Sequence, residues 1–217
     1  MAGQPTTTDK PSVTVFVMGD RLPWTDDSSP PDELGPLDAG VVHESGRREE
    51  CSIRKISALG ATLRGELAKA PGDDIAIELV TGQRPAGTID WVKGGETGIR
   101  FTQPVDVLAL INRKLVSQPV ERRTMPSVEL RCRVHIKCGG ALSIASMRNI
   151  SARGLQIEGA DLPAKGTYVS VFVEGLNVPP GEVIWSKGGL AGIELFEELS
   201  WSSIMPWIRG VVRNGAG

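Results

Sequence analysis

Short alternations of apolar and polar residues, separated by glycine- and proline-containing turns, run through most of the chain. A period of two is typical of half-buried strands, and the turn residues mark where one strand ends and the next begins. The clearest strands of the C-terminal half are predicted at 128–137, 146–150, 155–157, 168–173, 183–186 and 190–195. Those of the N-terminal half are predicted at 75–80, 88–92 and 97–101.

A helical period of apolar residues closes each half. These residues are Val105, Leu108, Ile111 and Leu115, and then Trp201, Ile204, Met205 and Ile208. Pro206 interrupts the second stripe, which predicts a short or distorted helix there. Short strands followed by one helix predict a mainly β fold of small antiparallel barrels, because closing a sheet removes its exposed edges.

The two halves are copies of each other. A shift of 94 residues places Gly60 on Gly154 and aligns the halves without a gap. Further matches are Ile56-Ser57 with Ile150-Ser151, Gly65 with Gly159, Gly72 with Gly166, Gly87 with Gly181, Trp91 with Trp185 and Gly98 with Gly192. Identities that concentrate at glycines indicate a conserved backbone geometry, so the chain contains a duplicated domain.

The N-terminal 38 residues differ from both copies. Proline and acidic residues dominate there, which predicts a largely disordered arm over 1–38. The apolar run 13–18 is the exception, and it can add a strand to one of the sheets. The first copy then spans 39–117 and the second spans 118–217.

Charge and hydropathy exclude several classes of function. The net charge is −2, so no overall positive field recruits nucleic acid. No apolar run approaches the roughly 20 residues that cross a bilayer, which predicts a cytoplasmic protein without membrane insertion. No acid pair, nucleophile turn or phosphate-binding glycine loop is evident, so we expect no enzymatic activity and no cofactor.

Three cysteines raise the question of metal or redox chemistry. Cys132 and Cys138 lie close together with His135 between them, but a metal site would need a fourth ligand. Val134 and Ile136 alternate with the cysteines on one strand, so the simpler interpretation is a shared apolar face and no metal site.

The segment Asn149-Ile-Ser-Ala-Arg-Gly154 resembles the [Asp/Asn]-x-Ser-x-x-Gly signature of PilZ domains, which bind cyclic di-GMP. This resemblance implies two tandem six-stranded antiparallel barrels, each closed by a short C-terminal helix. It also implies a cyclic di-GMP site formed by Asn149, Ser151 and Gly154. In the family's second element, Arg-x-x-x-Arg before the first strand, Arg123 matches the first arginine and Ser127 stands where the second belongs. Arg122 can substitute in part, so the resemblance also implies that Arg122 and Arg123 bind the nucleotide.

The resemblance leaves two functions open. In the first, the second barrel is a non-catalytic cyclic di-GMP receptor that signals to an unidentified protein partner. In the alternative, both copies are degenerate and the tandem is a protein-interaction adaptor that binds no nucleotide. Arg122, Arg123 and Asn149 favour the receptor; Ser127 favours the adaptor, as does Lys55, which replaces the Asp or Asn of the first copy's motif. Ser151 and Gly154 also suit a tight turn without any ligand.

Overall fold

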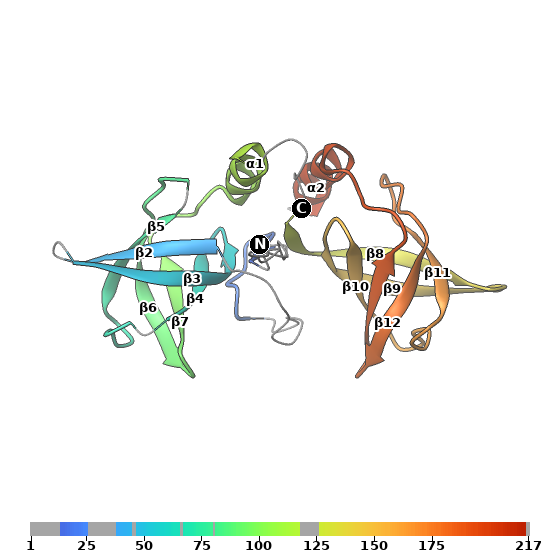
Figure 1. Ribbon diagram of the computed structural model, residues 1–217, viewed down its shortest axis with the longest axis horizontal. Coiled ribbons are helices and arrows are strands. Elements are labelled where there is room, and N and C mark those ends of the chain that lie inside the picture. Colours follow the sequence, from blue (N-terminus) through green and yellow to red (C-terminus); the bar gives the residue numbers. More distant parts are fainter. Residues whose placement is uncertain are drawn as a thin grey trace, which may run out of the picture.

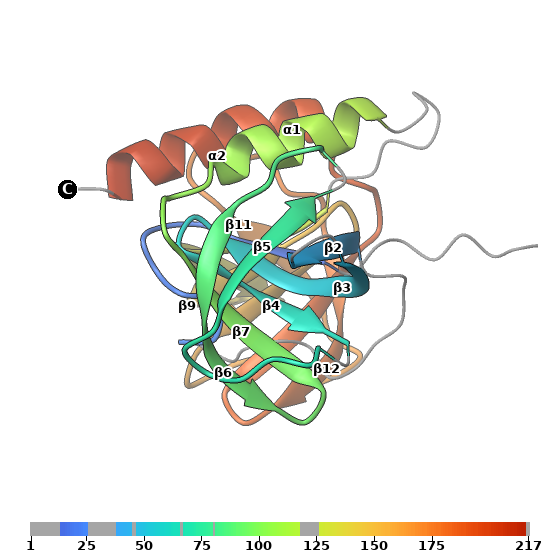
Figure 2. The ribbon, with the colours of Figure 1, turned by 90° about the vertical axis from the view of Figure 1, so that its left-hand side faces the viewer.

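The computed structural model describes residues 14–25, 38–44, 47–65, 67–79, 81–117 and 126–215. Within these ranges the chain is mainly β with two helices, as the sequence predicts. Figure 1 shows two halves side by side, and Figure 2, turned by 90°, shows both helices along the same side of the molecule. No helix in the described ranges is long and apolar enough to cross a membrane.

The N-terminal half consists of antiparallel strands whose pairings return to the strand where they begin. The order is β3-β2-β5-β6-β7-β4, and β4 pairs again with β3. The elements are β2 (Asp38–Glu44), β3 (Arg47–Ser57), β4 (Gly60–Arg64), β5 (Asp74–Leu79), β6 (Ala86–Lys93), β7 (Glu96–Phe101) and α1 (Val107–Ser117). A closed series of pairings leaves few strand edges open to other chains.

The C-terminal half repeats this arrangement. The order is β8-β9-β10-β13-β12-β11, and β11 pairs again with β8. The elements are β8 (Ser127–Cys138), β9 (Ala141–Ile150), β10 (Gly154–Glu158), β11 (Tyr168–Phe172), β12 (Gly181–Lys187), β13 (Leu190–Leu195) and α2 (Trp201–Gly215). Each pairing in one half has its counterpart in the other, so the repeat seen in the sequence is a repeat of topology.

The repeated tryptophan and glycine have a packing reason. The indole of Trp91 lies so close to Gly98 that a Cβ there would be 2.1 Å from its Nε1 atom. Trp185 covers Gly192 in the same way, again at 2.1 Å. Only glycine leaves room for the indole on the neighbouring strand, which explains why this pair persists in both copies.

A short strand from the N-terminal segment joins the two halves. β1 (Val15–Val17) pairs in parallel with β3 on one side and with β8 on the other. All three of its side chains are buried. The sequence predicts two separate units with a strand in 13–18 that could join either one, and the strand is confirmed. What differs is that it joins both units, so the pairings form one sheet of 13 strands.

The rest of the N-terminal segment is only partly described. Residues 18–25 follow β1, and Leu22 lies over Gly60 of the first half. Residues 1–13 and 26–37, on which most of the predicted disordered arm falls, lie outside the described residues.

Helix α2 differs from the short or distorted helix that Pro206 predicts. It runs unbroken from Trp201 to Gly215. Pro206 has no N–H, so the carbonyl of Ser202, four residues earlier, lacks its helical hydrogen bond. Both residues are exposed, so water can hydrogen-bond to that carbonyl. Ile204 and Ile208 of this helix are buried, and the Trp207 indole N–H donates to the Glu174 carbonyl oxygen of the second half at 2.9 Å.

The hydrophobic core is continuous between the halves. Buried residues of both copies belong to one cluster, to which β1 and the residue after it contribute Phe16 and Met18. The N-terminal strand therefore contributes packing as well as backbone hydrogen bonds to the junction.

Candidate functional site

The predicted motif forms the turn between β9 and β10. Asn149 lies near the end of β9, Ser151 lies in the turn, and Gly154 begins β10. The Ser151 N–H donates to the Gly154 carbonyl oxygen at 2.9 Å, and its hydroxyl donates to the same oxygen at 3.3 Å. The three residues lie together in one turn, since the whole motif is only six residues long.

The glycine of the motif is required by the sheet itself. A Cβ on Gly154 would lie 2.6 Å from the carbonyl oxygen of Ile193 on β13. The corresponding Gly60 is in the same position, where a Cβ would lie 2.3 Å from the carbonyl oxygen of Ile99. Both distances are too short for any other residue, so close approach of two strands explains this glycine in both copies.

The serine also has a structural role in both copies. Ser57, the counterpart of Ser151, donates from its hydroxyl to the Gly60 carbonyl oxygen at 3.4 Å. The Leu59 N–H donates to the Ser57 hydroxyl oxygen at 3.2 Å. The turn geometry is thus shared, and the copies differ in chemistry at the first position of the motif.

That first position is held by Asn149 in the second copy. Its side chain is only 9% exposed, and its Oδ1 atom accepts a hydrogen bond from the Ser127 hydroxyl at 2.7 Å. Ser127 opens β8 and stands where the resemblance places an arginine. The first residue of β8 is therefore hydrogen-bonded directly to the first residue of the motif.

The remaining predicted site residues lie outside the described residues. Arg122 and Arg123 belong to the undescribed segment 118–125. Two nearby arginines already have carboxylate partners: Arg148 pairs with Glu158, and the Arg153 Nε atom lies 2.7 Å from Glu198 Oε1.

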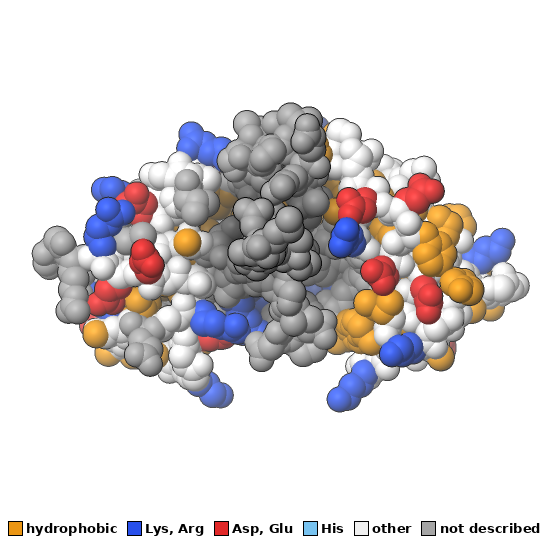
Figure 3. Space-filling model, in the orientation of Figure 1, with side chains coloured by type: hydrophobic (Ala, Val, Ile, Leu, Met, Phe, Trp, Pro, Cys, Tyr) orange, Lys and Arg blue, Asp and Glu red, His pale blue; other side chains and the backbone are white. Residues whose placement is uncertain are grey.

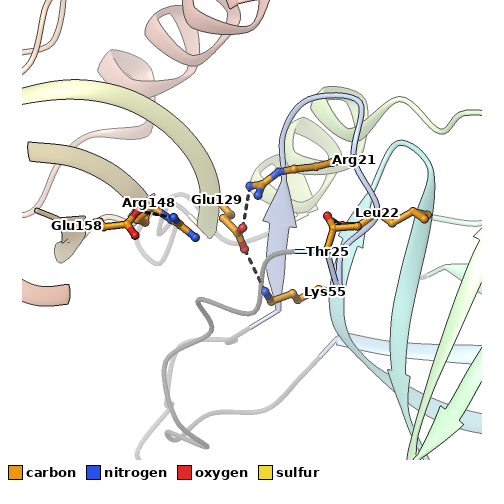
Figure 4. A network of polar contacts seen from close by, with 7 residues as sticks. All are labelled: Arg21, Leu22, Thr25, Lys55, Glu129, Arg148 and Glu158. Atoms are coloured by element: carbon orange, nitrogen blue, oxygen red, sulfur yellow. Dashed lines mark hydrogen bonds and ion pairs between the residues drawn. The ribbon is translucent and has the colours of Figure 1, made fainter. Parts of the chain in front are cut away.

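In the first copy the same position holds Lys55, which contacts the second copy. Its ammonium donates to Glu129 Oε2 at 3.1 Å, and both side chains are 3% exposed. Arg21 Nη2 lies 2.7 Å from Glu129 Oε1, as an ion pair without hydrogen-bond alignment. Figure 4 shows Glu129 between these two cations. Sequence reasoning missed this contact, although an acidic residue between the buried Val128 and Leu130 was a signal.

Strand β1 lies between Lys55 of the first copy's motif and Ser127 at the start of β8. Val15 is the register partner of Lys55 on β3 and of Ser127 on β8. Glu129 in turn pairs with Asn149 in the β8–β9 register. The buried Lys55–Glu129 pair and the Ser127–Asn149 hydrogen bond therefore lie close together in one sheet.

The cysteine side chains are buried or half-buried. Cys132 is half-buried against the core, and burial raises the pKa of its thiol to about 11. Burial likewise raises the pKa of the Cys51 thiol to about 11. Both are protonated at neutral pH, and a protonated thiol is a poor nucleophile and metal ligand.

Several solved structures show a weak similarity to this chain. PlzA of Borreliella burgdorferi in complex with c-di-GMP is 11% identical, with 78% of this chain and 86% of that chain covered and a TM-score of 0.32. The Bacillus subtilis inhibitor of motility MotI/DgrA is 12% identical, with 84% and 98% covered and a TM-score of 0.26. YcgR of Escherichia coli in complex with c-di-GMP is 12% identical, with 82% and 83% covered and a TM-score of 0.25.

No protein-family model matches the chain, and no curated protein matches it significantly. The TM-scores are below 0.5, so these similarities alone decide neither the fold family nor the function. Those two questions depend on the chain's own residues.

Proposed function

We propose that the chain is a tandem PilZ-like protein that acts as a non-catalytic receptor for cyclic di-GMP in the cytoplasm and signals to a protein partner. Each half would be a six-stranded antiparallel barrel with a helix at its C-terminal end. The closed order of strand pairings in each half supports this fold. So does the position of the motif, at a turn between neighbouring strands of that order.

The nucleotide site would lie in the second half and use Arg122, Arg123, Asn149, Ser151 and Gly154. The observation that carries this proposal is the position of Asn149 beside the start of β8, the strand that Arg122 and Arg123 precede in the chain. Arg123 is four residues before Ser127, so its Cα lies within roughly 14 Å of Ser127 at full extension. A span this short allows the guanidiniums to reach the amide-bearing turn, and such a combination suits a ligand with two phosphates, because arginine binds phosphate through paired N–H groups.

The first half lacks this combination. Lys55 replaces the asparagine, and its ammonium is buried against Glu129. A buried ammonium paired with a carboxylate is not presented to a dianionic ligand. We therefore assign the first half a structural and relay role.

A specific observation favours the alternative, an adaptor that binds no nucleotide. Ser127 takes the place of an arginine, and its hydroxyl already occupies Asn149 Oδ1. Ser151 and Gly154 serve the turn in both copies, so their presence does not require a ligand.

Calorimetric titration of the full chain with cyclic di-GMP decides between the two. A receptor binds one nucleotide per chain, with an affinity that falls as salt rises, because phosphate–arginine attraction is screened. Arg123→Ala and Asn149→Ala weaken this binding, whereas Lys187→Ala at the exposed end of β12 leaves it unchanged. Absence of heat at high protein and nucleotide concentrations in low salt overturns the receptor and supports the adaptor.

A further inference from the structure

The outward side of β8 carries a row of basic and titratable side chains. Arg131, Arg133, His135 and Lys137 alternate with buried residues, and all four are exposed. Their neighbours Val134 and Ile136 point inward and belong to the core. The row therefore crosses the outer surface of the second half.

Large apolar side chains flank this row on both sides. Ile144 on β9 pairs with His135, and Leu142 pairs with Lys137. On the other side Phe172 of β11 pairs with His135. Directly paired residues project from the same face of a sheet, so these side chains lie beside the basic row. Their exposed fractions are 65% for Leu142, 64% for Ile144, 68% for Tyr168 and 53% for Phe172.

We call this surface the β8 face: the four outward residues of β8 with Leu142, Ile144, Tyr168 and Phe172. Its apolar character continues to Phe196, whose ring centroid lies 5.6 Å from that of Tyr168. Figure 3 shows hydrophobic side chains gathered over β11 and β12 of this half. Several large, exposed apolar side chains gathered on one face are unusual for a surface that contacts only water.

The first copy shows that the fold does not require this patch. Leu142, Ile144, Tyr168, Phe172, Ile184 and Phe196 correspond to Arg48, Glu50, Asp74, Glu78, Asp90 and Thr102. These polar residues interact on the surface, as in the pairs Arg48–Glu78 at 3.8 Å and Arg100–Asp90 at 2.7 Å. Six outward positions on one scaffold are thus polar in one copy and apolar in the other.

The outward positions of β8 differ in the other direction, since they are more polar in the second copy than in the first. Arg133, His135 and Lys137 correspond to Ala39, Val41 and His43 in the first copy. The second copy therefore combines arginine and lysine with apolar flanks, at positions where the first copy has no arginine or lysine and its flanks are polar. A surface depression of about 430 Å³ adjoins the row, lined by Arg131, Arg133, Ile144 and Glu158 among others.

We infer that the β8 face binds a protein partner through an acidic segment of that partner whose apolar side chains alternate with its carboxylates. Carboxylates complement the cationic row, and apolar side chains cover its flanks. Tyr168, Glu182 and Glu194 form one rung of the sheet, so acidic groups border the patch on that side. They repel a polyanion that extends past the basic row, such as nucleic acid, more than a short acidic segment that lies along β8. The proposed function requires a protein partner, and the β8 face indicates the chemistry of that partner. Only the signalling role of this contact rests on the proposed function.

Short synthetic peptides test the inference by fluorescence anisotropy on the full chain without nucleotide. A peptide that alternates glutamate and leucine binds, and its affinity falls as salt rises. The counterpart with lysine in place of glutamate does not bind, nor does one that alternates glutamate and serine. Because no nucleotide is present, failure here leaves the titration with cyclic di-GMP unaffected, and the two failures can be told apart.

Variants taken from the first copy locate the binding. Phe172→Glu and Ile144→Glu introduce residues that the same positions carry in the first copy, so the fold accommodates them. Each weakens peptide binding by about tenfold or more, as expected for an interface anchor. Val92→Thr alters an exposed apolar residue of the first half (42% exposed) and serves as the matched control, with binding unchanged.

Several outcomes overturn the inference. One is equal binding of the acidic and basic peptides, and another is acidic–apolar binding that survives Phe172→Glu and Ile144→Glu. A third outcome comes from analytical ultracentrifugation. If wild type is a dimer and Phe172→Glu is a monomer, the β8 face binds a second copy of the chain instead of a partner. Binding of single-stranded DNA that Phe172→Glu abolishes assigns it to nucleic acid instead.

Discussion

The ammonium of Lys55 and the carboxylate of Glu129 meet at 3.1 Å across the junction between the two copies, both of them buried. Lys55 stands at the position that holds Asn149 in the other copy. The two halves therefore differ at this position, because one carries an amide there and the other carries a cation that contacts the neighbouring half.

This contact predicts a large loss of stability on removal of either partner. Lys55→Met leaves Glu129 in the interior with only the Arg21 ion pair, and removing one partner of a buried pair costs about 3 kcal/mol. Urea unfolding monitored by tryptophan fluorescence measures the change. Lys187→Met, at the exposed end of β12, is the control and stays within about 0.5 kcal/mol of wild type.

The double variant Lys55→Met/Glu129→Leu separates charge from packing. Replacing both charged groups by apolar ones removes the unpaired carboxylate, so most of the lost stability returns. A double variant as unstable as the sum of the two single ones would show that the Lys55–Glu129 pairing is not the source of the effect.

Strand β1 predicts that the halves unfold together. Phe16 is buried between β3 and β8, and Phe16→Ala costs about 3–4 kcal/mol because it leaves a cavity in the core. Wild type shows one cooperative transition, and Phe16→Ala separates it into two. The fragment 118–217 still folds, since its strand pairings close without β1, but it melts at lower temperature than the full chain. An unchanged melting profile in Phe16→Ala would mean that β1 does not couple the halves.

The repeated architecture could be predicted because its signals are local. Strand alternation, glycine turns and the Trp91–Gly98 contact all act within about ten residues, and duplication makes them appear twice. The strands with which β1 pairs, β3 and β8, could not be predicted from local signals. A strand of three residues shows only an apolar run, and its two partner strands lie far along the chain.

In the candidate site, too, the local features were predictable and the contacts between distant parts of the chain were not. Asn149, Ser151 and Gly154 meet because they belong to one turn, which the motif predicts. The partner of Lys55 is 74 residues away, so the sequence shows only that a lysine departs from the motif. The apolar flanks of the β8 face were detectable in principle by comparing outward positions of the two copies, such as Phe172 with Glu78.

The motif glycines provide a test that needs no ligand. Gly154→Ala and Gly60→Ala each place a Cβ against a backbone carbonyl of the next strand, which costs about 1–3 kcal/mol. Similar losses in both copies, measured by thermal unfolding, support a steric role. Gly140→Ala, where a Cβ meets nothing within 4 Å, is the control. A loss confined to nucleotide binding, with stability unchanged, would contradict the steric role of Gly154.

The thiol of Cys132 is predicted to react slowly. Its pKa of about 11 lies above the value near 8.5 of a free cysteine, so at pH 8 far less thiolate is present in the folded chain than in the unfolded one. In a Cys51→Ala/Cys138→Ser variant, iodoacetamide labels Cys132 at least about a hundredfold more slowly in buffer than in urea. The folded rate continues to rise with pH up to about 11. A folded rate that levels off near pH 8 would contradict the raised pKa.

The last prediction concerns Ser127 and the missing arginine. An additional charge-assisted hydrogen bond contributes roughly 1.5–3 kcal/mol, so Ser127→Arg tightens cyclic di-GMP binding by about ten- to a hundredfold. Ser127→Ala is the matched variant, because it frees Asn149 Oδ1 without adding a guanidinium. Calorimetry on both separates the two effects: equal gains would mean that the Ser127 hydroxyl blocks Asn149, whereas a gain in Ser127→Arg alone means that a cation was lacking. Asn149→Ala weakens binding in either background, since the amide is part of the proposed site. If Ser127→Arg gains nothing and wild type shows no binding, the receptor is wrong and the adaptor replaces it.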